Sequence, residues 1–268
     1  MCGICAIENK LKDPLNVFND EDYDRLIHGI AAGLITTQSL DYHTYQKIAR
    51  KLSEGVYTGY GANINDTTNM VDYNMLFDLR RNVYVFSGAK TYQEVREVSS
   101  LLVEKDKNEI KSFSDYKVKA KEVLTKYNED YLHAEYNSAI AQSRSASQWI
   151  DFEKNKDLYP YLIYHTVGDS HVRPTHAALD GISRPLSDKF WDLYLPPNGW
   201  NCRCTVLQGD NETEKTNLQG FKQPSDVPDI FLMNAGKDRI VFSPKHPYFS
   251  VAPKDKHLLK VNWNLPTP

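Results

Sequence analysis

The sequence predicts an α+β protein with three parts: a mostly helical region (residues 1–155), a compact, turn-rich mixed α/β motif (residues 156–208) and an extended C-terminal tail (residues 209–268). Two observations support this prediction. Apolar residues recur with helical spacing as far as about residue 150, and strand, proline, glycine and aromatic signals become dense after Asn155. A chain of 268 residues is long enough to bury a core, as one large domain or as two smaller ones.

Charge and cysteine content narrow the class of protein. The formal net charge is −3, and domains that bind nucleic acid through bulk charge usually carry a basic excess, so the sequence gives no support for that class. Four cysteines in 268 residues are too few for a disulfide framework. We see neither a secretory signal nor an apolar run of membrane-spanning length, and we therefore expect a chain made and used in a reducing cytoplasm, with no membrane partner.

Five segments between residues 21 and 105 are predicted to form regular elements. Residues 21–36 and 36–55 are predicted helices, with Ser39 as the cap and Gly55 as the stop of the second. Residues 66–81 form a third predicted helix. The run NVYVFSGAK, residues 82–90, breaks the helical pattern with β-branched and aromatic residues and predicts a short strand or an extended connection. A further helix over residues 91–105 is predicted from a stripe of Tyr92, Val95, Val98 and Leu102.

The clearest helix covers residues 128–155. Its seam residues recur at alternating steps of four and three: Leu132, Tyr136, Ala139, Ser143, Ala146 and Ile150. Small residues on this seam would let another helix approach closely. Because the pattern lasts only about three heptads, we interpret it as an internal bundle helix rather than an oligomerising coiled coil.

The turn-rich motif starts with a strand predicted over residues 158–167. Asp180-Gly181 is a tight-turn dipeptide, and Pro196-Pro197-Asn198-Gly199 predicts a second turn that leads into a strand. Residues two apart on a strand point the same way, so Cys202 and Cys204 would share one face while Arg203 points to the other. In the tail we expect one short strand, DRIVFS, residues 238–243.

The cysteine pair leaves two interpretations open. His171 and His176 have an H-x4-H spacing, and with Cys202 and Cys204 they would supply two nitrogens and two sulfurs, a set suited to tetrahedral zinc. Alternatively, His176 and the cysteines pack together in a small domain whose turns are held by ionic contacts of Asp169, Arg173, Asp180 and Arg203. We disfavour catalysis, because the cysteines follow a rigid turn and the sequence shows no separate group that could form an oxyanion hole.

The stretch YHTVGDSHVRPTHAALDGISRPLSDKFWDLYLPPNGWNCRCTV, Tyr164 to Val206, resembles the signature of the phage Mu F-like head morphogenesis family, and the resemblance extends over Ala134 to Gln208. In that family some members carry cysteines at the positions of Arg173 and His176, which would complete a set of four cysteines. Here Arg173 stands at the first of these positions, which weakens the metal interpretation. The residues that carry the resemblance are Asp169, Arg173, His176, Leu179, Asp180, Gly181, Asp188, Phe190, Trp191, Pro196, Pro197, Asn201, Cys202, Arg203 and Cys204.

This resemblance implies a minor head protein of a tailed phage or prophage, assembled into the virion in the host cytoplasm in few copies. It also implies partners: the portal protein and other head proteins, with contact to packaged DNA, in packaging or ejection, as a further option. It points to assembly rather than enzymatic chemistry, and we expect the tyrosine-rich N-terminal helices to make the partner contact. The alternatives are a Mu F-like effector or toxin-associated protein delivered with the particle, and a zinc-stabilised adaptor.

Overall fold

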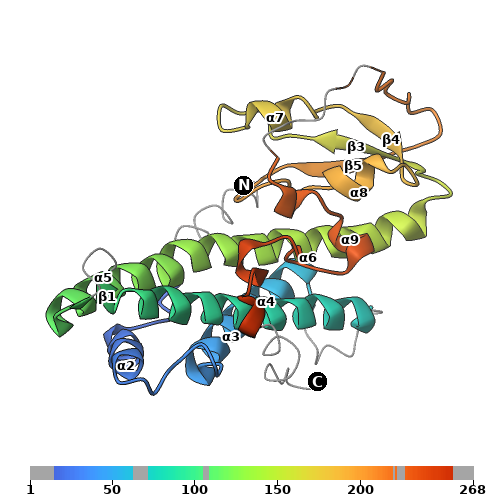
Figure 1. Cartoon of the computed structure of the whole chain (residues 1–268). Helices are drawn as coiled ribbons and strands as arrows, with labels where there is room; N and C mark the ends of the chain where they lie inside the picture. The colour runs from blue at the N-terminus through green and yellow to red at the C-terminus, as the bar shows by residue number, and fades with distance from the viewer. Residues whose placement is uncertain (1–14, 63–71, 105–108, 220, 222–226, 256–268) are drawn as a thin grey trace. The chain divides into compact units, whose positions relative to one another are not determined.

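The computed structural model describes residues 15–62, 72–104, 109–219, 221 and 227–255 (Figure 1). Helices dominate the described chain as far as residue 155 and a small antiparallel sheet follows, so the predicted α+β class is confirmed. The chain divides into two compact units. Unit 1 combines residues 1–53, 83–137 and 247–268, and unit 2 combines residues 54–82 and 138–246.

Unit 1 is built around a helical core. It contains α2 (Asp20–Ala31), most of α3 (Tyr42–Tyr60), the second part of α4 (Tyr73–Ser100), and α5 (Phe113–Thr125), with a hairpin of β1 (Val103–Glu104) and β2 (Glu109–Ile110) before α5. A capping box starts α2, because Asn19 and Asp22 exchange side chain to backbone hydrogen bonds of 3.0 and 2.9 Å. The core side chains are Tyr23, Leu26, Ile27, Ile30, Val95, Val98, Tyr116, Ala120 and Leu124.

The strand predicted over residues 82–90 is wrong: these residues lie inside α4, a helix of 28 residues. Their β-branched and aromatic side chains favour a strand only weakly, and packing overrides such a preference. Val83, Phe86 and Ala89 are spaced three residues apart and are fully buried, so the segment presents a helical face to its surroundings. Tyr92, Val95 and Val98 continue the same helix, as predicted, and Leu102 follows its end.

Two predicted boundaries of α3 are also wrong. The helix starts at Tyr42, after Asp41, whose carboxylate accepts a hydrogen bond of 3.1 Å from the Thr44 amide, and Ser39 lies outside it. The helix then continues through Gly55, which is buried, and ends at Tyr60. Of the helix predicted over residues 66–81, the part from Tyr73 onward belongs to α4, and residues 66–71 lie outside the described residues.

A buried polar cluster surrounds Lys90 in unit 1. Lys90 is fully buried, pairs with Glu135 at 2.9 Å, and donates a hydrogen bond of 2.7 Å to the Tyr127 carbonyl oxygen. That carbonyl belongs to the π-helical segment η1 (Lys126–Tyr131), which connects α5 to α6 (Leu132–Asn155). Glu94 is also fully buried, and burial raises the pKa of its carboxyl group to about 8.

In unit 2, a close helix contact uses the small residues of the predicted seam. Ala139, Ser143 and Ala146 on α6 are fully buried, which confirms an internal helix face. On α3, a Cβ atom placed on Gly59 would lie only 2.0 Å from the Ile140 carbonyl oxygen, so the absence of a side chain is required there. Small residues thus let the two backbones meet, as the seam predicts.

The sheet of unit 2 has the strand order β4-β3-β5 and is antiparallel (Figure 1). Strand β3 (Tyr161–His165) lies within the predicted residues 158–167, and pairs with β4 (Ser183–Pro185) and β5 (Thr205–Gly209). Short helices α7 (Pro174–Ala177) and α8 (Phe190–Tyr194) lie in the connections. The core combines Trp149, Phe152, Leu162, Tyr164, Leu179, Ile182, Leu186, Phe190, Trp191, Tyr194, Leu195 and Val206.

The final described segment, residues 227–255, is packed rather than free. In unit 2 it forms η2 (Asp229–Phe231) and α9 (Ala235–Asp238), and in unit 1 it forms η3 (Pro247–Phe249) and η4 (Pro253–Asp255). The strand predicted over residues 238–243 is wrong, because Arg239 has a φ of 58° at the end of α9 and the following backbone is irregular. The amides of Val241 and Phe242 instead donate to the Asn82 side chain at 3.0 and 2.7 Å.

Two further predictions concern surfaces. Among the tyrosines of the N-terminal helices, Tyr23, Tyr45 and Tyr60 are buried, whereas Tyr42 and Tyr73 expose 57% and 42% of their surface. Within the described ranges, no helix is both long enough and apolar enough to cross a membrane.

Candidate metal centre in the turn-rich unit

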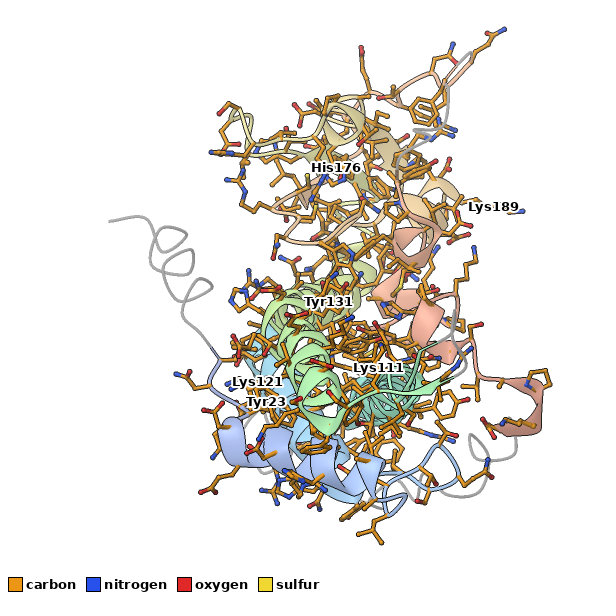
Figure 2. The ribbon with its side chains drawn as sticks, turned by 60° about the vertical axis from the view of Figure 1, so that its left-hand side comes forward. Tyr23, Lys111, Lys121, Tyr131, His176 and Lys189 are labelled. Carbon is orange, nitrogen blue, oxygen red and sulfur yellow. The ribbon has the colours of Figure 1, made fainter. Side chains whose placement is uncertain are left out.

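His176 is brought to the site by a short helix. Pro174 occupies the first position of α7, where the missing amide hydrogen costs nothing, and Arg173 is the N-cap. His176 is buried, with an exposed fraction of 3%. In Figure 2 it lies among the side chains of unit 2, whereas Lys189 points outward.

Cys202 and Cys204 are brought to the same place by the second predicted turn. The Pro196-Pro197 peptide bond is cis, Asn201 adopts a left-handed φ of 55°, and the Cys202 amide donates to the Gly199 carbonyl at 3.2 Å. Asparagine tolerates this left-handed conformation better than most residues. The two cysteines precede β5, and their side chains point to one side while Arg203 binds Asp169, as the alternation of an extended chain predicts.

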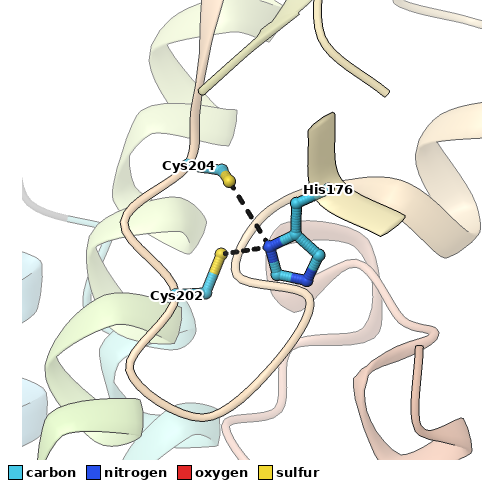
Figure 3. A group of neighbouring side chains, drawn as sticks. All are labelled: His176, Cys202 and Cys204. Atoms are coloured by element: carbon cyan, nitrogen blue, oxygen red, sulfur yellow. Dashed lines mark hydrogen bonds between the residues drawn. The ribbon is translucent and has the colours of Figure 1, made fainter. Parts of the chain in front are cut away.

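The three side chains converge on one ring nitrogen (Figure 3). The Sγ atoms of Cys202 and Cys204 lie 3.6 and 3.5 Å from His176 Nδ1, and the three ligand atoms lie within 4.8 Å of one another. The hydrogen bond with Cys204 lowers the pKa of the Cys202 thiol, and His176 lowers it further. The same bond, together with burial, raises the pKa of the Cys204 thiol, so the pair shares one negative charge more readily than it carries two.

Buried side chains that the sequence did not single out hold this arrangement. Asn198 is fully buried in the turn, where its side-chain oxygen accepts a 3.0 Å hydrogen bond from the Tyr164 hydroxyl of β3. Burial raises the pKa of that hydroxyl, so Tyr164 stays protonated and acts as a donor. In the sequence, the Asn-Gly pair indicates a turn at Asn198. It does not indicate the hydrogen bond to Tyr164, because the two residues are 34 positions apart.

The polar residues expected around the cysteines do not form one network. Arg203 makes two hydrogen bonds of 2.7 Å to Asp169 near the surface, and this pairing lowers the pKa of the Asp169 carboxyl group to about 2. Arg173 instead donates a 2.7 Å hydrogen bond to the Trp200 carbonyl oxygen. Asp180 accepts a 2.7 Å hydrogen bond from the Thr166 amide and precedes Gly181, whose φ of 75° forms the predicted tight turn.

His171 has a different place from His176. Its side chain is exposed, its backbone amide binds Asp169, and it is not a member of the convergent group. Of the four predicted zinc ligands, the structure therefore brings together His176, Cys202 and Cys204.

The remaining motif residues shape the fold around the site. Asp188 accepts hydrogen bonds of 2.9 Å from Arg184 Nε and from the Phe190 amide, which fixes the start of α8. Trp191 is fully buried and its ring nitrogen donates to the Arg184 carbonyl at 3.2 Å. Asn234, another buried residue that sequence reasoning missed, donates a 2.9 Å hydrogen bond to the Trp191 carbonyl oxygen. These contacts connect the motif to the following segment.

Chemically, the convergent group offers one imidazole nitrogen and two sulfurs, and such a group could hold a metal ion. Asp169 does not orient His176 as the acid of a triad would, because its carboxylate is engaged by Arg203. The rest of the motif is occupied in packing and in turn formation.

Comparisons with known proteins agree with the sequence motif. Residues 102–207 match the family model described as Phage Mu protein F like protein, which is less than half of the chain. A protein of Escherichia phage Mu named capsid assembly protein F is 41% identical over 71 residues, which cover 26% of this chain and 16% of the relative. The Mu-like prophage FluMu F protein of Haemophilus influenzae is 39% identical over 61 residues, which cover 23% and 15%.

No solved structure matches the chain at a significant level. The aligned stretches span about one sixth of each curated relative. The match to the family model includes the β1–β2 hairpin, α5, α6 and the whole Cys/His group, and it begins earlier in the chain than the motif suggested. Residues 102–207 are therefore similar to the phage Mu F-like family, and a stretch of 71 residues in the chain is also similar to a phage Mu protein named for capsid assembly.

Proposed function

We propose that this chain is a minor head protein of a tailed phage or prophage, which joins the assembling head in few copies and contacts the portal protein. The observation that carries the proposal is the 71-residue alignment at 41% identity with a protein named for capsid assembly. Because that alignment covers 16% of the relative, the role of the whole relative comes to this chain only as a proposal. Contact with packaged DNA, during packaging or ejection, is a second part of the same proposal.

The first test is a count of this chain in purified particles. Quantitative mass spectrometry against the portal and major capsid subunits should find a few copies per particle. If the chain is absent from particles, and if deleting its gene leaves the yield of filled heads unchanged, the proposal fails. Toxicity on expression would then favour the effector alternative.

The second test asks whether the matched region is needed for assembly. Trp191→Ala removes a fully buried ring from the core of unit 2 and should reduce the yield of heads in complementation. Lys189→Ala is the matched control, because Lys189 lies two residues away and is exposed. Equal yields from the two variants would show that head formation does not need this region.

The portal contact is tested separately at the exposed tyrosines. Tyrosine is enriched in protein interfaces, and Tyr42 exposes 57% of its surface on α3. Tyr42→Ser should weaken capture of this chain by the purified portal protein. Leu158→Ser, which changes an apolar residue that is 70% exposed outside these helices, is the control. Undiminished capture of Tyr42→Ser would remove this surface from the proposal.

The segment from Asp238 onward is a poor target for a test of the effector alternative. It includes the buried residues Val241, Phe242 and Tyr248, so a deletion from Asp238 would expose the core they cover. Loss of toxicity in such a deletion would report unfolding. An internal point substitution that leaves these three side chains in place is therefore the appropriate variant.

A further inference from the structure

The nitrogen-to-sulfur distances in the Cys/His group match those between the ligands of a tetrahedral metal site. In a tetrahedral zinc site, Zn–N bonds of about 2.1 Å and Zn–S bonds of about 2.3 Å place nitrogen and sulfur about 3.6 Å apart. The two sulfurs in unit 2 lie 3.6 and 3.5 Å from His176 Nδ1. The same bond lengths require about 3.8 Å between the sulfurs. All three ligand atoms lie within 4.8 Å of one another, which is close to the separations that a single ion requires.

Hydrogen bonding alone explains this convergence less well. A neutral imidazole nitrogen that accepts a hydrogen bond has one lone pair in the ring plane, and a protonated one has a single N–H to donate. Nδ1 can therefore make one good hydrogen bond with a thiol, yet two sulfurs lie at nearly equal distances from it. A metal ion satisfies all three atoms at once, because it binds the nitrogen and both sulfurs from a single point.

The ligands are held in place by contacts that do not use their own coordinating atoms. Arg173, at the start of α7, donates to the Trp200 carbonyl and so connects the segment carrying His176 to the turn that carries the cysteines. A Cβ atom on Gly199 would lie 3.3 Å from Arg173 Nη1 and 3.7 Å from His176 Cε1, so the turn passes close beneath both side chains. Such second contacts orient the ligands of metal sites in proteins.

We propose that His176, Cys202 and Cys204 bind a structural zinc ion that connects α7 to the segment leading into β5. Two thiolates and one imidazole favour zinc over the hard cations magnesium and calcium, which prefer oxygen ligands. Among the described residues the group has three ligands, because His171 stands outside it, and both cysteines are partly exposed, so the fourth position of the ion is accessible to solvent. This proposal does not depend on the role in head assembly.

The expected consequence is stability rather than catalysis. The ion would connect two segments that are 26 residues apart at Cys202 and 28 residues apart at Cys204. A ligand that binds the folded state and not the unfolded state raises the free energy of unfolding by RT ln(1 + [L]/Kd), and the unfolding midpoint rises with it. Removing zinc with a chelator should therefore lower the melting temperature, and adding it back should restore the original value.

The test uses the full chain, purified without chelator, and measures its metal content. One zinc ion per chain is expected, and Cys202→Ser and His176→Gln should each reduce that content at least tenfold. His171→Ala is the matched control and should keep one zinc ion. The double substitution Cys2→Ser, Cys5→Ser changes the other two cysteines of the sequence, which lie outside the described residues, and should also keep it. Zinc content unchanged in Cys202→Ser, or lost in either control, would overturn the three-ligand site.

A second measurement covers the case in which a variant fails to fold. Chelator-treated wild-type protein is titrated with Co²⁺, whose visible absorption is intense in tetrahedral sites and gains a charge-transfer band from thiolate ligands. Saturation at one equivalent, with displacement of Co²⁺ by Zn²⁺ and a rise in melting temperature, supports the proposal. A folded wild-type chain that contains no zinc and binds neither ion at micromolar concentrations would refute it.

Discussion

The two units bury polar groups in different ways. In unit 1, the Lys90 ammonium group on α4 contacts the Glu135 carboxylate and the Tyr127 carbonyl oxygen. The ring centroids of Tyr127 and Tyr248 each lie 5.4 Å from its nitrogen. In unit 2, His176 meets the sulfurs of two cysteines that share one negative charge. The first cluster pairs its buried cation with a carboxylate of the protein, whereas we propose that the second binds an added ion. A buried group can therefore be matched by a protein partner or by a bound cation, and the difference can be measured.

The largest effect is expected from breaking the pair in unit 1. Lys90→Met leaves the buried Glu135 carboxylate without its cation and should lower the free energy of unfolding by about 3–5 kcal/mol. The double variant Lys90→Met, Glu135→Leu should recover much of the loss, since it removes both charges. Urea denaturation measures both. The control is Lys121→Ala, which removes an exposed ion pair with Asp20 and should lower the free energy of unfolding only slightly. If Lys90→Met lowers it no more than Lys121→Ala does, the buried pair contributes little to stability.

The second prediction concerns pH and Glu94. Its pKa of about 8 in the folded chain lies above the ordinary value of 4.5, because burial disfavours the charged form. Stability from this group is therefore complete below pH 4.5, and it falls by about 1.4 kcal/mol per pH unit as the pH rises toward 8. Glu94→Gln should flatten this decline between pH 5 and pH 8 in urea denaturation.

The charged groups around Glu94 belong to several elements: Lys90 on the same helix, Glu135 on α6 and Asp41 before α3, with the Asn128 amide of η1 also facing it. The matched control is Glu97→Gln, one turn further along α4, whose carboxylate accepts a 2.8 Å hydrogen bond from the Tyr127 hydroxyl. A pH profile of Glu94→Gln that runs parallel to that of the wild type would contradict the buried neutral carboxyl.

A third, smaller effect is expected at the helix contact of unit 2. Gly59→Ala places a methyl group 2.0 Å from the Ile140 carbonyl oxygen, and because the obstacle is backbone the helices must shift. Overpacking of this kind costs about 1–3 kcal/mol, which thermal denaturation can resolve. The counterpart is Ala146→Gly on the seam of α6, which removes a methyl group instead. If Gly59→Ala is as stable as the wild type, the close approach does not exist in solution.

The smallest effect is expected from the exposed pair beside the metal centre. Arg203→Ala removes the two hydrogen bonds to Asp169, but the two side chains are 30% and 41% exposed, so the unfolding midpoint should change little. Zinc content should also stay at one per chain, because Arg203 points away from the sulfurs. A loss of zinc in this variant would show that the salt bridge positions the cysteines.

The errors of prediction and the successes have different physical origins. Residues 82–90 have strand-like side chains, yet they form a helix because Val83, Phe86 and Ala89 lie on one buried face. By contrast, strand β3, the Asp180-Gly181 turn and the seam of α6 follow from patterns within a few residues of chain. Local signals succeed where packing agrees with them, and they fail where packing overrides them.

The sequence by itself determined the α+β class, the order of helical region and turn-rich motif, the resemblance to the phage Mu F-like family, and the common direction of Cys202 and Cys204. Only the tertiary structure decided that His176, and not His171, meets those cysteines, and that Lys90 and Glu135 close a buried cluster. The physical reason is distance along the chain. Spacing controls which side chains share a face, but contacts between residues 26 or 45 positions apart depend on how whole elements pack.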